Sequence, residues 1–366
     1  MSKVTIGIPA YKATEHICDA LASIQIQTMR SEIQVIVATD LPGEDYSFVK
    51  DRFPELDIMI LPCEKNTGVG LARQRALDAC QTDWVTFMDA DDVLISPLAI
   101  EDLYRGCVAA DNIIECQGAF YEELMEPQEG VRIMLRNEIS QPWVFAKMYS
   151  VKFLRQHNIR FSDLRAMEDG EFNWKITLTL GNCDNQFINR IDKPIYFWRT
   201  GSEHSITRIK MKGSDIPQYN FDLGAWGTIE AAIRAVRFAR EQNPDNPMIN
   251  DFILDVMLSC YFTWVECLEK APVFTAQNAW NAQRFYHEVY KDIERDIPEQ
   301  KIKDAFSAKS ISRGQSLMGT IPTITWYDFM DPIRNENYHG IEDLKRIRAD
   351  LPQEVIDNDK KTGVLG

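Results

Sequence analysis

The sequence predicts an α/β fold in which a mainly parallel sheet is flanked by helices and is followed by a helical region. Three observations predict it. Short apolar runs alternate with amphipathic stretches over residues 4–107, acidic residues follow two of these runs, and the pattern becomes purely helical beyond Ile206. A β-α-β-α order places helices on both faces of a parallel sheet, and ligands then bind beyond the carboxyl ends of the strands.

The first two strands and the first helix follow from apolar spacing. Residues 4–8 alternate apolar with polar or small side chains until Pro9, which predicts a strand that ends there. Residues 17–24 carry apolar side chains at helical spacing. Residues 33–38 are apolar apart from one glutamine, so we expect a second buried strand.

The alternation then continues through two more strands and two helices. Residues 56–61 predict a third strand, and residues 71–79 predict a helix that is entered through Gly68 and Gly70. Residues 84–88 form the last apolar run of this series. A helix is expected over residues 97–107.

Helical spacing dominates the later part of the chain. Residues 229–239 carry one apolar stripe, residues 252–268 are apolar on nearly every side, and residues 279–293 are amphipathic. The segment from 331 is rich in charged and amide side chains, which predicts a mobile end. We therefore expect a catalytic domain over 1–207, a helical domain over 208–330 and a polar tail over 331–366.

Composition excludes several classes of protein. The chain has 366 residues, 45% of them hydrophobic, and a formal net charge of −15, which argues against a surface that coats nucleic-acid phosphates. The eight cysteines are dispersed without a CxxC pair, which is typical of reduced thiols in a cytosolic protein. No stretch reads as a signal peptide or a membrane span, so we expect neither.

The most informative motif is Asp89-Ala90-Asp91-Asp92, at the end of the apolar run 84–88. Three carboxylates at a buried strand's tip suit a hard divalent cation that carries a diphosphate, because such ions select oxygen ligands. The alternative is a helix start, in which Asp91 or Asp92 caps the segment that leads into residues 97–107.

Five segments in order resemble the family 2 glycosyltransferases, which have the GT-A fold, a Rossmann-like sheet flanked by helices. The five are Val4–Tyr11, Asn66–Arg73, Phe87–Asp92, Met167–Phe172, and Tyr196–Arg199 with His204–Thr207. The resemblance covers about the first 207 residues. It implies a metal-dependent, inverting transferase that moves a sugar from a nucleotide diphosphate, with UDP the expected nucleotide, to a hydroxyl acceptor.

The resemblance also implies a set of donor-site residues. Tyr11 stacks on the base, Asp40 accepts its imide proton, and Arg73 points back to the nucleotide from the first turn of its helix. Asp91, Asp89 and His204 are the implied ligands of Mn²⁺ or Mg²⁺. The remaining expected donor contacts are Pro9, Ala10, Asn66, Gly68, Asp89, Arg199 and Thr207.

On the acceptor side, the resemblance places the catalytic base at Asp169. Adjacent carboxylates repel, so either Glu168 or Asp169 shares a proton or pairs with Arg165. The alternative for both is an acidic pair favoured by a helix N-terminus. Trp143 and Lys147 lie in a stretch that resembles the family's acceptor wall, although Trp143 equally suits a core position.

Gly68 and Gly70 let backbone approach a ligand closely. A lone G-x-G is a weak signal, and the alternative is a loop before a solvated helix. Asp40 sits in an altered context, Thr39-Asp40-Leu41-Pro42, which leaves the base identity open.

Other functions stay open at this stage. The expected acceptor is a glycan or cell-surface polysaccharide, and the protein is cytoplasmic or peripheral to the inner face of a membrane. One alternative acts on hydroxymethylated DNA bases, with Arg234, Arg237 and Arg240 as a phosphate track, although three arginines on one helix are more often a solvated face. A nucleotidyltransferase would need a basic glycine-rich first loop, which residues 9–13 lack. A non-catalytic nucleotide- or glycan-binding relative has no need of Asp169.

Overall fold

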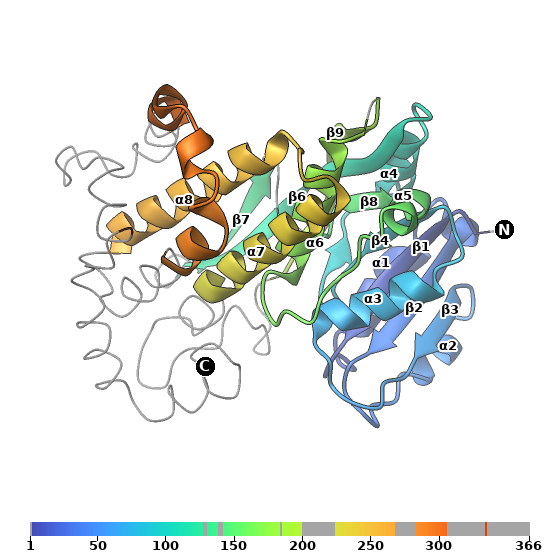
Figure 1. Ribbon diagram of the computed structural model, residues 1–366. Coiled ribbons are helices and arrows are strands. Elements are labelled where there is room, and N and C mark those ends of the chain that lie inside the picture. The colour runs from blue at the N-terminus through green and yellow to red at the C-terminus, as the bar shows by residue number, and fades with distance from the viewer. Residues whose placement is uncertain are drawn as a thin grey trace, which may run out of the picture. The chain divides into compact units, whose positions relative to one another are not determined.

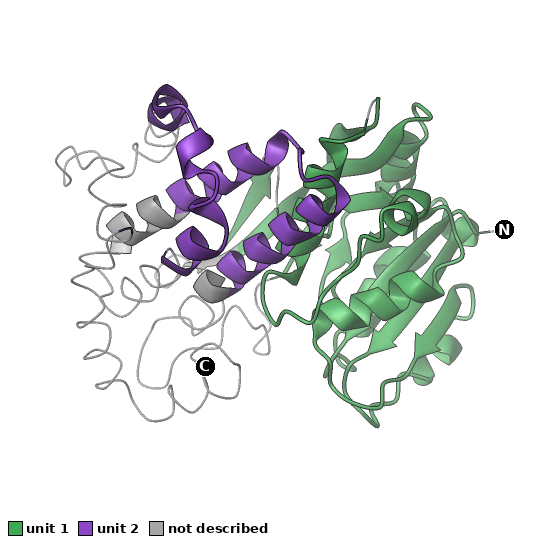
Figure 2. Ribbon diagram, in the orientation of Figure 1, with its two compact units in different colours: residues 1–208 green, residues 209–366 purple. Residues whose placement is uncertain are grey.

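The computed structural model describes residues 2–126, 130–137, 142–183, 185–199, 224–267, 283–305 and 334. The chain divides into two compact units, Met1–Arg208 and Ile209–Gly366 (Figure 2). Each unit is described by itself below.

The first unit contains one sheet whose strands run in the order β3-β2-β1-β4-β8-β6-β9-β5 (Figure 1). Its first four strands in this order are mutually parallel, as the sequence predicts. They are β3 (Asp57–Leu61), β2 (Ile33–Thr39), β1 (Val4–Ala10) and β4 (Trp84–Phe87). The four strands therefore present their carboxyl ends at one edge.

Three helices of this half match the predicted positions, and a short fourth one was not predicted. They are α1 (Ile17–Gln25), α3 (Val69–Ala79) and α4 (Ala99–Cys107), with a short α2 (Phe48–Arg52) between β2 and β3. Helix α4 begins at Ala99 after Leu98, so Asp91 and Asp92 do not cap it. The capping alternative for the acidic motif is therefore wrong.

The other half of the sheet was not predicted from the sequence. It comprises β5 (Val93–Leu94), β6 (Ile113–Glu126), β7 (Gly130–Arg136), β8 (Lys147–Ser150) and β9 (Phe187–Trp198). Strand β8 runs antiparallel to both β4 and β6, whereas β6 and β9 are parallel. Helices α5 (Val151–Gln156) and α6 (Glu168–Leu180) lie between β8 and β9 in the chain.

The core lies on both faces of the parallel strands, because alternate side chains of a strand point to opposite faces. In β2, Val35 and Val37 join the large cluster, while Ile36 and Ala38 pack with Ala72 and Ala76 of α3. This is why β2 has a nearly continuous apolar sequence.

In the second unit, α7 (Gly224–Gln242) and α8 (Met248–Cys267) pack together. The predicted apolar stripe of α7, Ile229, Ala232, Ile233, Val236 and Ala239, is buried as expected. The predicted 279–293 helix is described only from residue 283, where a short helix contains a π-helical turn, Tyr286–Tyr290. No helix within the described residues is long and apolar enough to cross a membrane.

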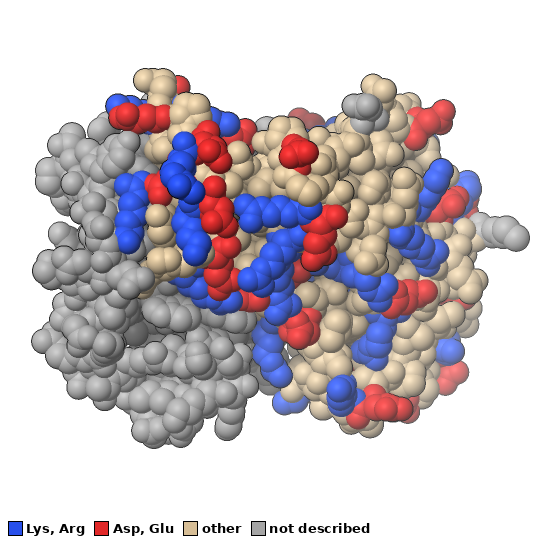
Figure 3. Space-filling view, in the orientation of Figure 1, with Lys and Arg blue, Asp and Glu red and all other residues tan. Residues whose placement is uncertain are grey.

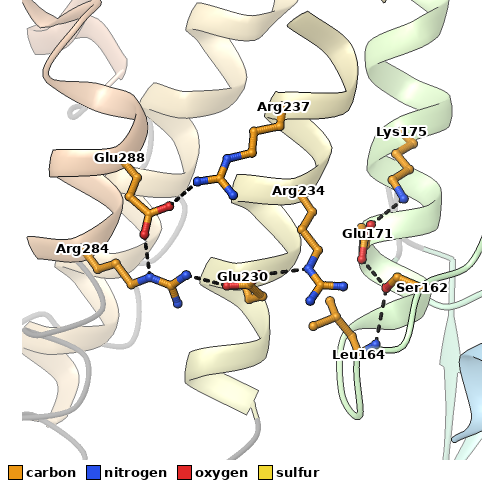
Figure 4. A network of polar contacts seen from close by, with 9 residues as sticks. All are labelled: Ser162, Leu164, Glu171, Lys175, Glu230, Arg234, Arg237, Arg284 and Glu288. Atoms are coloured by element: carbon orange, nitrogen blue, oxygen red, sulfur yellow. Dashed lines mark hydrogen bonds and ion pairs between the residues drawn. The ribbon is translucent and has the colours of Figure 1, made fainter. Parts of the chain in front are cut away.

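A network of ion pairs joins the elements of the second unit (Figure 4). Glu230 accepts hydrogen bonds from Arg234 at 2.9 Å and from Arg284 at 2.7 Å. Glu288 accepts from Arg237 and Arg284, both at 2.7 Å. These contacts fix α7 against the segment that contains Arg284 and Glu288.

Substituting Phe172 tests the packing of α6. Its ring is fully buried, stacks on Phe161 with centroids 4.0 Å apart and meets Phe87 edge-on. We expect Phe172→Ala to lower the free energy of unfolding by about 3–5 kcal/mol, measured by urea denaturation. The matched control is Val131→Ala, because Val131 is 56% exposed and should change stability by less than about 0.5 kcal/mol. An equal loss in both variants would contradict this description of the core.

Candidate functional site at the carboxyl edge of the parallel strands

The candidate site lies where β1, β2 and β4 end. Tyr11 follows β1, Asp40 follows β2, and Asp89 lies two residues after the last residue of β4. Because these strands are parallel neighbours, the three side chains are brought to one edge of the sheet. The sequence predicts this convergence.

Tyr11 is the exposed aromatic of this edge. It is 48% exposed, and the Nζ atom of Lys12 lies 5.4 Å from its ring centroid. Lys12 has a positive φ of 51°, and its amide donates to the carboxylate of Glu44 at 3.0 Å. Pro9 and Ala10 end β1 directly before it. The ring face is therefore held at the surface, where a planar ligand can stack.

Asp40 is engaged by the loop that precedes α3. Its carboxylate accepts hydrogen bonds from the amides of Thr67 and Gly68, each at 2.8 Å, and it is only 4% exposed. Gly68 has a φ of +90°, which favours glycine. Asp40 therefore fixes this loop, with Asn66 left exposed beside it. Its predicted contact with the base stays a prediction.

Gly70 lies against protein, whereas the sequence analysis expected it to approach a ligand. A Cβ atom added there would lie 2.5 Å from the carbonyl oxygen of Ser162 and 3.0 Å from Cγ of Glu168. That expectation is therefore wrong for Gly70, because the missing side chain lets α3 approach the segment before α6. This contact brings Arg73 within reach of Glu168.

The acidic motif after β4 is divided between two roles. Asp92 is almost fully buried and accepts hydrogen bonds from the Tyr196 hydroxyl at 2.6 Å and from the Arg199 amide at 2.7 Å. The Tyr196 hydroxyl also accepts a hydrogen bond from the amide of Asp89. Asp92 thus joins the tip of β4 to the end of β9, and Asp89 and Asp91 remain partly exposed.

Crowded carboxylates shift one another's ionisation at this tip. Burial and the charge of Asp89 raise the pKa of Asp91, and nearby His16 and Arg199 oppose that shift. Burial and the charges of both neighbours raise the pKa of Asp92 well above its usual range. An excess of negative charge at this place fits a cation.

Arg73 links this motif to the N-terminus of α6. Its guanidinium donates to Asp89 and to Glu168, each at 2.7 Å, and the residue is 5% exposed. The Nε atom has no hydrogen-bond partner within the described residues. Each of its two terminal nitrogens thus donates a hydrogen bond to a carboxylate of the protein.

Glu168 and Asp169 occupy the first turn of α6, where the helix dipole favours negative charge. The preceding residue, Met167, has a φ of 64° in the left-handed region, which is uncommon for a non-glycine residue and is typical of functional sites. Burial first, and then the charge of Glu168, raises the pKa of Asp169 to about 7, against the opposing effect of Arg73. Asp169 can therefore exchange a proton near neutral pH.

The predicted acceptor residues lie beside this turn. Lys147 is buried in β8 with its Nζ atom 3.9 Å from Glu115, and burial lowers its pKa while the charges of Glu115 and Asp169 oppose that shift. Trp143 is partly buried and stacks on Phe145 with centroids 6.0 Å apart. It also contacts Trp198, which supports the core alternative.

A second polar network braces α6 within the first unit (Figure 4). Glu171 is buried and contacts the ammonium of Lys175 and the hydroxyl of Ser162. Ser162 also accepts a hydrogen bond from the amide of Leu164. Glu171 therefore joins α6 to the loop that precedes it, two residues after Asp169.

The other predicted residues fall into two groups, those outside the described residues and those with other partners. His204 and Thr207 lie outside the residues that the structure describes. The guanidinium of Arg199 pairs with Asp19 at 2.8 Å, although its charge still reaches Asp91. Arg165, the expected partner of the acidic pair, is exposed, and Arg73 takes that place instead.

Sequence reasoning missed two residues of this edge. Tyr196 was quoted only as part of a motif, and its hydroxyl bonds were not foreseen. His16 precedes α1 and lies close enough to Asp91 to influence its pKa. The one available signal for His16 was its position in the loop after the first strand.

The residues present suit a hard divalent cation in part. Asp89 and Asp91 offer carboxylate oxygens, which such ions prefer. Within the described residues, no three His, Cys, Asp or Glu side chains are placed to hold a metal by themselves. The two carboxylates would therefore hold the ion together with oxygens of a ligand.

Comparisons with known proteins agree with this arrangement. The family model described as Glycosyl transferase family 2 matches residues 5–163. Glycosyltransferase GlyA of Streptococcus pneumoniae is 27% identical over 226 residues, which are 54% of this chain and 30% of that protein. The teichoic acid poly(glycerol phosphate) polymerase of Staphylococcus epidermidis is 24% identical over 272 residues, 70% of this chain and 35% of that protein. The chain thus spans about a third of the length of these two relatives.

Solved structures show the same fold. Residues 1–349 of Staphylococcus aureus TarS in complex with UDP-GlcNAc match with a TM-score of 0.60 at 17% identity, over 86% of this chain and 92% of that one. The complex of the same protein with UDP matches with a TM-score of 0.59 at 16% identity, over 88% and 94%. The predicted fold class, a GT-A-like sheet flanked by helices with further helices later in the chain, is confirmed.

The raised pKa of Asp169 predicts a pH-dependent gain of stability in Asp169→Asn. A carboxyl group whose pKa is higher in the folded state stabilises that state below its unfolded pKa, and the contribution is lost as pH rises through about 7. Because asparagine does not ionise, the variant does not lose this stability as pH rises. We expect its melting temperature to exceed that of the wild type by several degrees at pH 8, and the gap to narrow markedly at pH 5, by differential scanning fluorimetry. A gap that is the same at both pH values would contradict the raised pKa.

Proposed function

We propose that this chain, whose residues 5–163 match glycosyl transferase family 2, transfers a sugar from a nucleotide diphosphate to a hydroxyl acceptor with the help of a divalent cation. The expected donor is a UDP-sugar, and the expected outcome is inversion at the anomeric carbon. The observation that carries the proposal is Asp169, an acid of pKa about 7 that is linked through Glu168 and Arg73 to Asp89.

This arrangement supplies the groups that a single displacement requires. The acceptor hydroxyl must lose a proton as its oxygen attacks the anomeric carbon, and Asp169 takes that proton. Mn²⁺ or Mg²⁺, held by Asp89 and Asp91, would neutralise the departing diphosphate. Because attack comes from the face opposite the leaving group, one displacement inverts the configuration.

The donor side rests on the exposed ring of Tyr11 and on the loop that Asp40 fixes. Tyr11 stacks on the base, with Pro9, Ala10, Asn66 and Gly68 lining the nucleotide. The support for UDP comes from TarS, whose solved complexes contain UDP and UDP-GlcNAc. We extend that nucleotide to this chain, with UDP-GlcNAc as the first donor to test.

The acceptor proposal comes from the relatives. One is a teichoic acid poly(glycerol phosphate) polymerase, and TarS of Staphylococcus aureus is a poly(ribitol-phosphate) β-N-acetylglucosaminyltransferase, 23% identical to this chain over 213 residues. We therefore propose a cell-wall or cell-surface glycopolymer as the acceptor. Lys147, whose pKa responds to the charge of Asp169, and Trp143 are the proposed acceptor-side residues.

The described residues give no support to modified DNA as the acceptor. Two of the three arginines expected to track phosphates are ion-paired, Arg234 with Glu230 and Arg237 with Glu288. Lys and Arg side chains are interspersed with Asp and Glu side chains over the visible surface (Figure 3). Binding to DNA would therefore have to displace existing ion pairs.

Two substitutions separate donor binding from transfer. We expect Asp91→Asn to weaken Mn²⁺-dependent binding of UDP more than tenfold, because it removes a charged oxygen ligand. We expect Asp169→Asn to leave that binding within about twofold but to lower transfer at least about 100-fold, because the base is lost. Calorimetry with UDP and Mn²⁺ measures the first effect. Release of UDP from UDP-GlcNAc, with poly(ribitol phosphate) or poly(glycerol phosphate) as acceptor, measures the second.

Asp83→Asn is the matched control for both assays, because Asp83 is exposed and precedes β4 at the opposite end of the strand. Transfer by Asp169→Asn at the wild-type rate would refute the base assignment. Wild-type protein that fails to bind UDP in the presence of Mn²⁺ would refute the donor site.

The pH dependence of transfer gives an independent test. Asp169 must be ionised to accept a proton, so kcat/KM should rise about tenfold per pH unit below about 7 and level off above it. Glu168→Gln should move the rise to lower pH, because the charge of Glu168 helps to raise the pKa of Asp169. A profile that is flat between pH 5.5 and 8 would contradict the role of Asp169.

A further inference from the structure

We propose that Arg73 is an internal counter-cation that competes with the divalent cation for Asp89 and positions Glu168 and Asp169 for transfer, and that it is not a contact for the donor phosphates. The inference rests on the proposed function and concerns the same site. It makes Arg73 a positioning residue that joins the donor side to the acceptor side.

The first argument is that the guanidinium is already committed. Its two terminal nitrogens lie 2.7 Å from Asp89 and 2.7 Å from Glu168, on elements far apart in the sequence. Charge-assisted bonds of this length are strong when they are shielded from water, and the side chain of Arg73 is only 6% exposed. To reach a diphosphate, Arg73 would have to abandon two short bonds and leave Glu168 buried and unpaired.

The second argument is that the backbone is shaped for this contact. Gly70, one turn before Arg73, lets α3 approach Ser162 and Glu168 more closely than any side chain would allow. Met167 takes a left-handed conformation directly before Glu168. Both features allow α3 and the start of α6 to lie close together. That closeness permits the bond between Arg73 and Glu168.

The third argument is charge balance. Asp89, Arg73 and Glu168 together carry one net negative charge. A divalent cation at Asp89 shares one carboxylate with Arg73 and repels it at short range, as Coulomb's law requires. Donor binding therefore shifts Arg73 towards Glu168, and the acceptor side senses the donor through that shift. Without Arg73, the cation gains affinity and the acceptor side loses its support.

The experiment compares Mn²⁺ binding in four proteins by calorimetry and by electron paramagnetic resonance, so that no acceptor is needed. The proteins are the wild type, Arg73→Met, Glu168→Gln and the double variant. The double variant is the decisive one, since it keeps the net charge of the cluster and leaves no buried ion unpaired between α3 and α6. We expect it to bind Mn²⁺ roughly tenfold more tightly than the wild type, because the competitor has gone.

The other variants define the direction of the effect. Arg73→Met should bind Mn²⁺ most tightly of the four. Glu168→Gln should bind it most weakly, because Arg73 then has Asp89 as its only charged partner in the cluster. In the UDP-release assay, the double variant should keep or lower the KM for UDP-GlcNAc while its kcat falls at least about tenfold. Arg155→Met is the control, because Arg155 binds the carbonyls of Leu77 and Cys80 at the other end of α3. It should leave Mn²⁺ affinity and kcat unchanged.

Two outcomes would overturn the inference. If the double variant binds Mn²⁺ no more tightly than the wild type, Arg73 does not compete for Asp89. If it binds Mn²⁺ tightly but loses UDP, Arg73 is a phosphate contact after all. A wild-type protein that binds neither Mn²⁺ nor UDP is a different result, which refutes the proposed function itself. Thermal unfolding of the four proteins and the Arg155→Met control identifies any variant that fails to fold. If Arg73→Met fails to fold, the charge-balanced double variant still tests the inference.

Discussion

The structure depends on how one edge of the sheet accommodates five carboxylates. Asp89, Asp91 and Asp92 follow β4, and Glu168 and Asp169 begin α6. Buried charges of one sign are costly unless they are paired or hydrogen-bonded. Each carboxylate meets this constraint differently: Asp92 through Tyr196, Asp89 and Glu168 through Arg73, and Asp169 by a raised pKa. Asp91 keeps a partly exposed carboxylate.

This constraint explains features that would otherwise look unrelated. The end of β9 is held at the acidic motif that follows β4, because the amide of Arg199 and the hydroxyl of Tyr196 both bind Asp92. Gly70 is required because α3 must lie close enough to α6 for Arg73 to reach Glu168. Asp40 fixes the loop from which α3 starts, so the position of Arg73 is set from both sides. Ion pairs and hydrogen bonds therefore position the side chains of the site, and the apolar core positions the strands and helices that carry them.

The same arrangement divides the chemistry among separate elements. The proposed nucleotide side consists of loops after parallel strands, where the ring of Tyr11 is exposed. Asp169, the proposed base, lies in the first turn of α6, a helix that contacts among Glu171, Ser162 and Lys175 brace. An acid of pKa about 7 on a braced helix can take a proton near neutral pH without moving far. The link between the two sides is a single guanidinium, that of Arg73.

The sequence by itself determined the parallel half of the fold and brought most residues of the candidate site to attention. The nearly continuous apolar run of β2 and the apolar alternation of β1 both predict strands, and such patterns are local information. The sequence did not reveal β6, because the buried polar residues Glu115 and Gln117 interrupt its apolar pattern. Gln117 donates to Glu115 within the same strand, and Lys147 of β8 lies beside Glu115. Strand β9 was not foreseen either, because most of its side chains are exposed or half-buried. Nor could it show that Gly70 faces Ser162, that Arg73 bridges Asp89 and Glu168, or that Asp169 has a pKa near 7. Those properties arise from distances between residues up to about a hundred positions apart, and only the tertiary structure sets such distances.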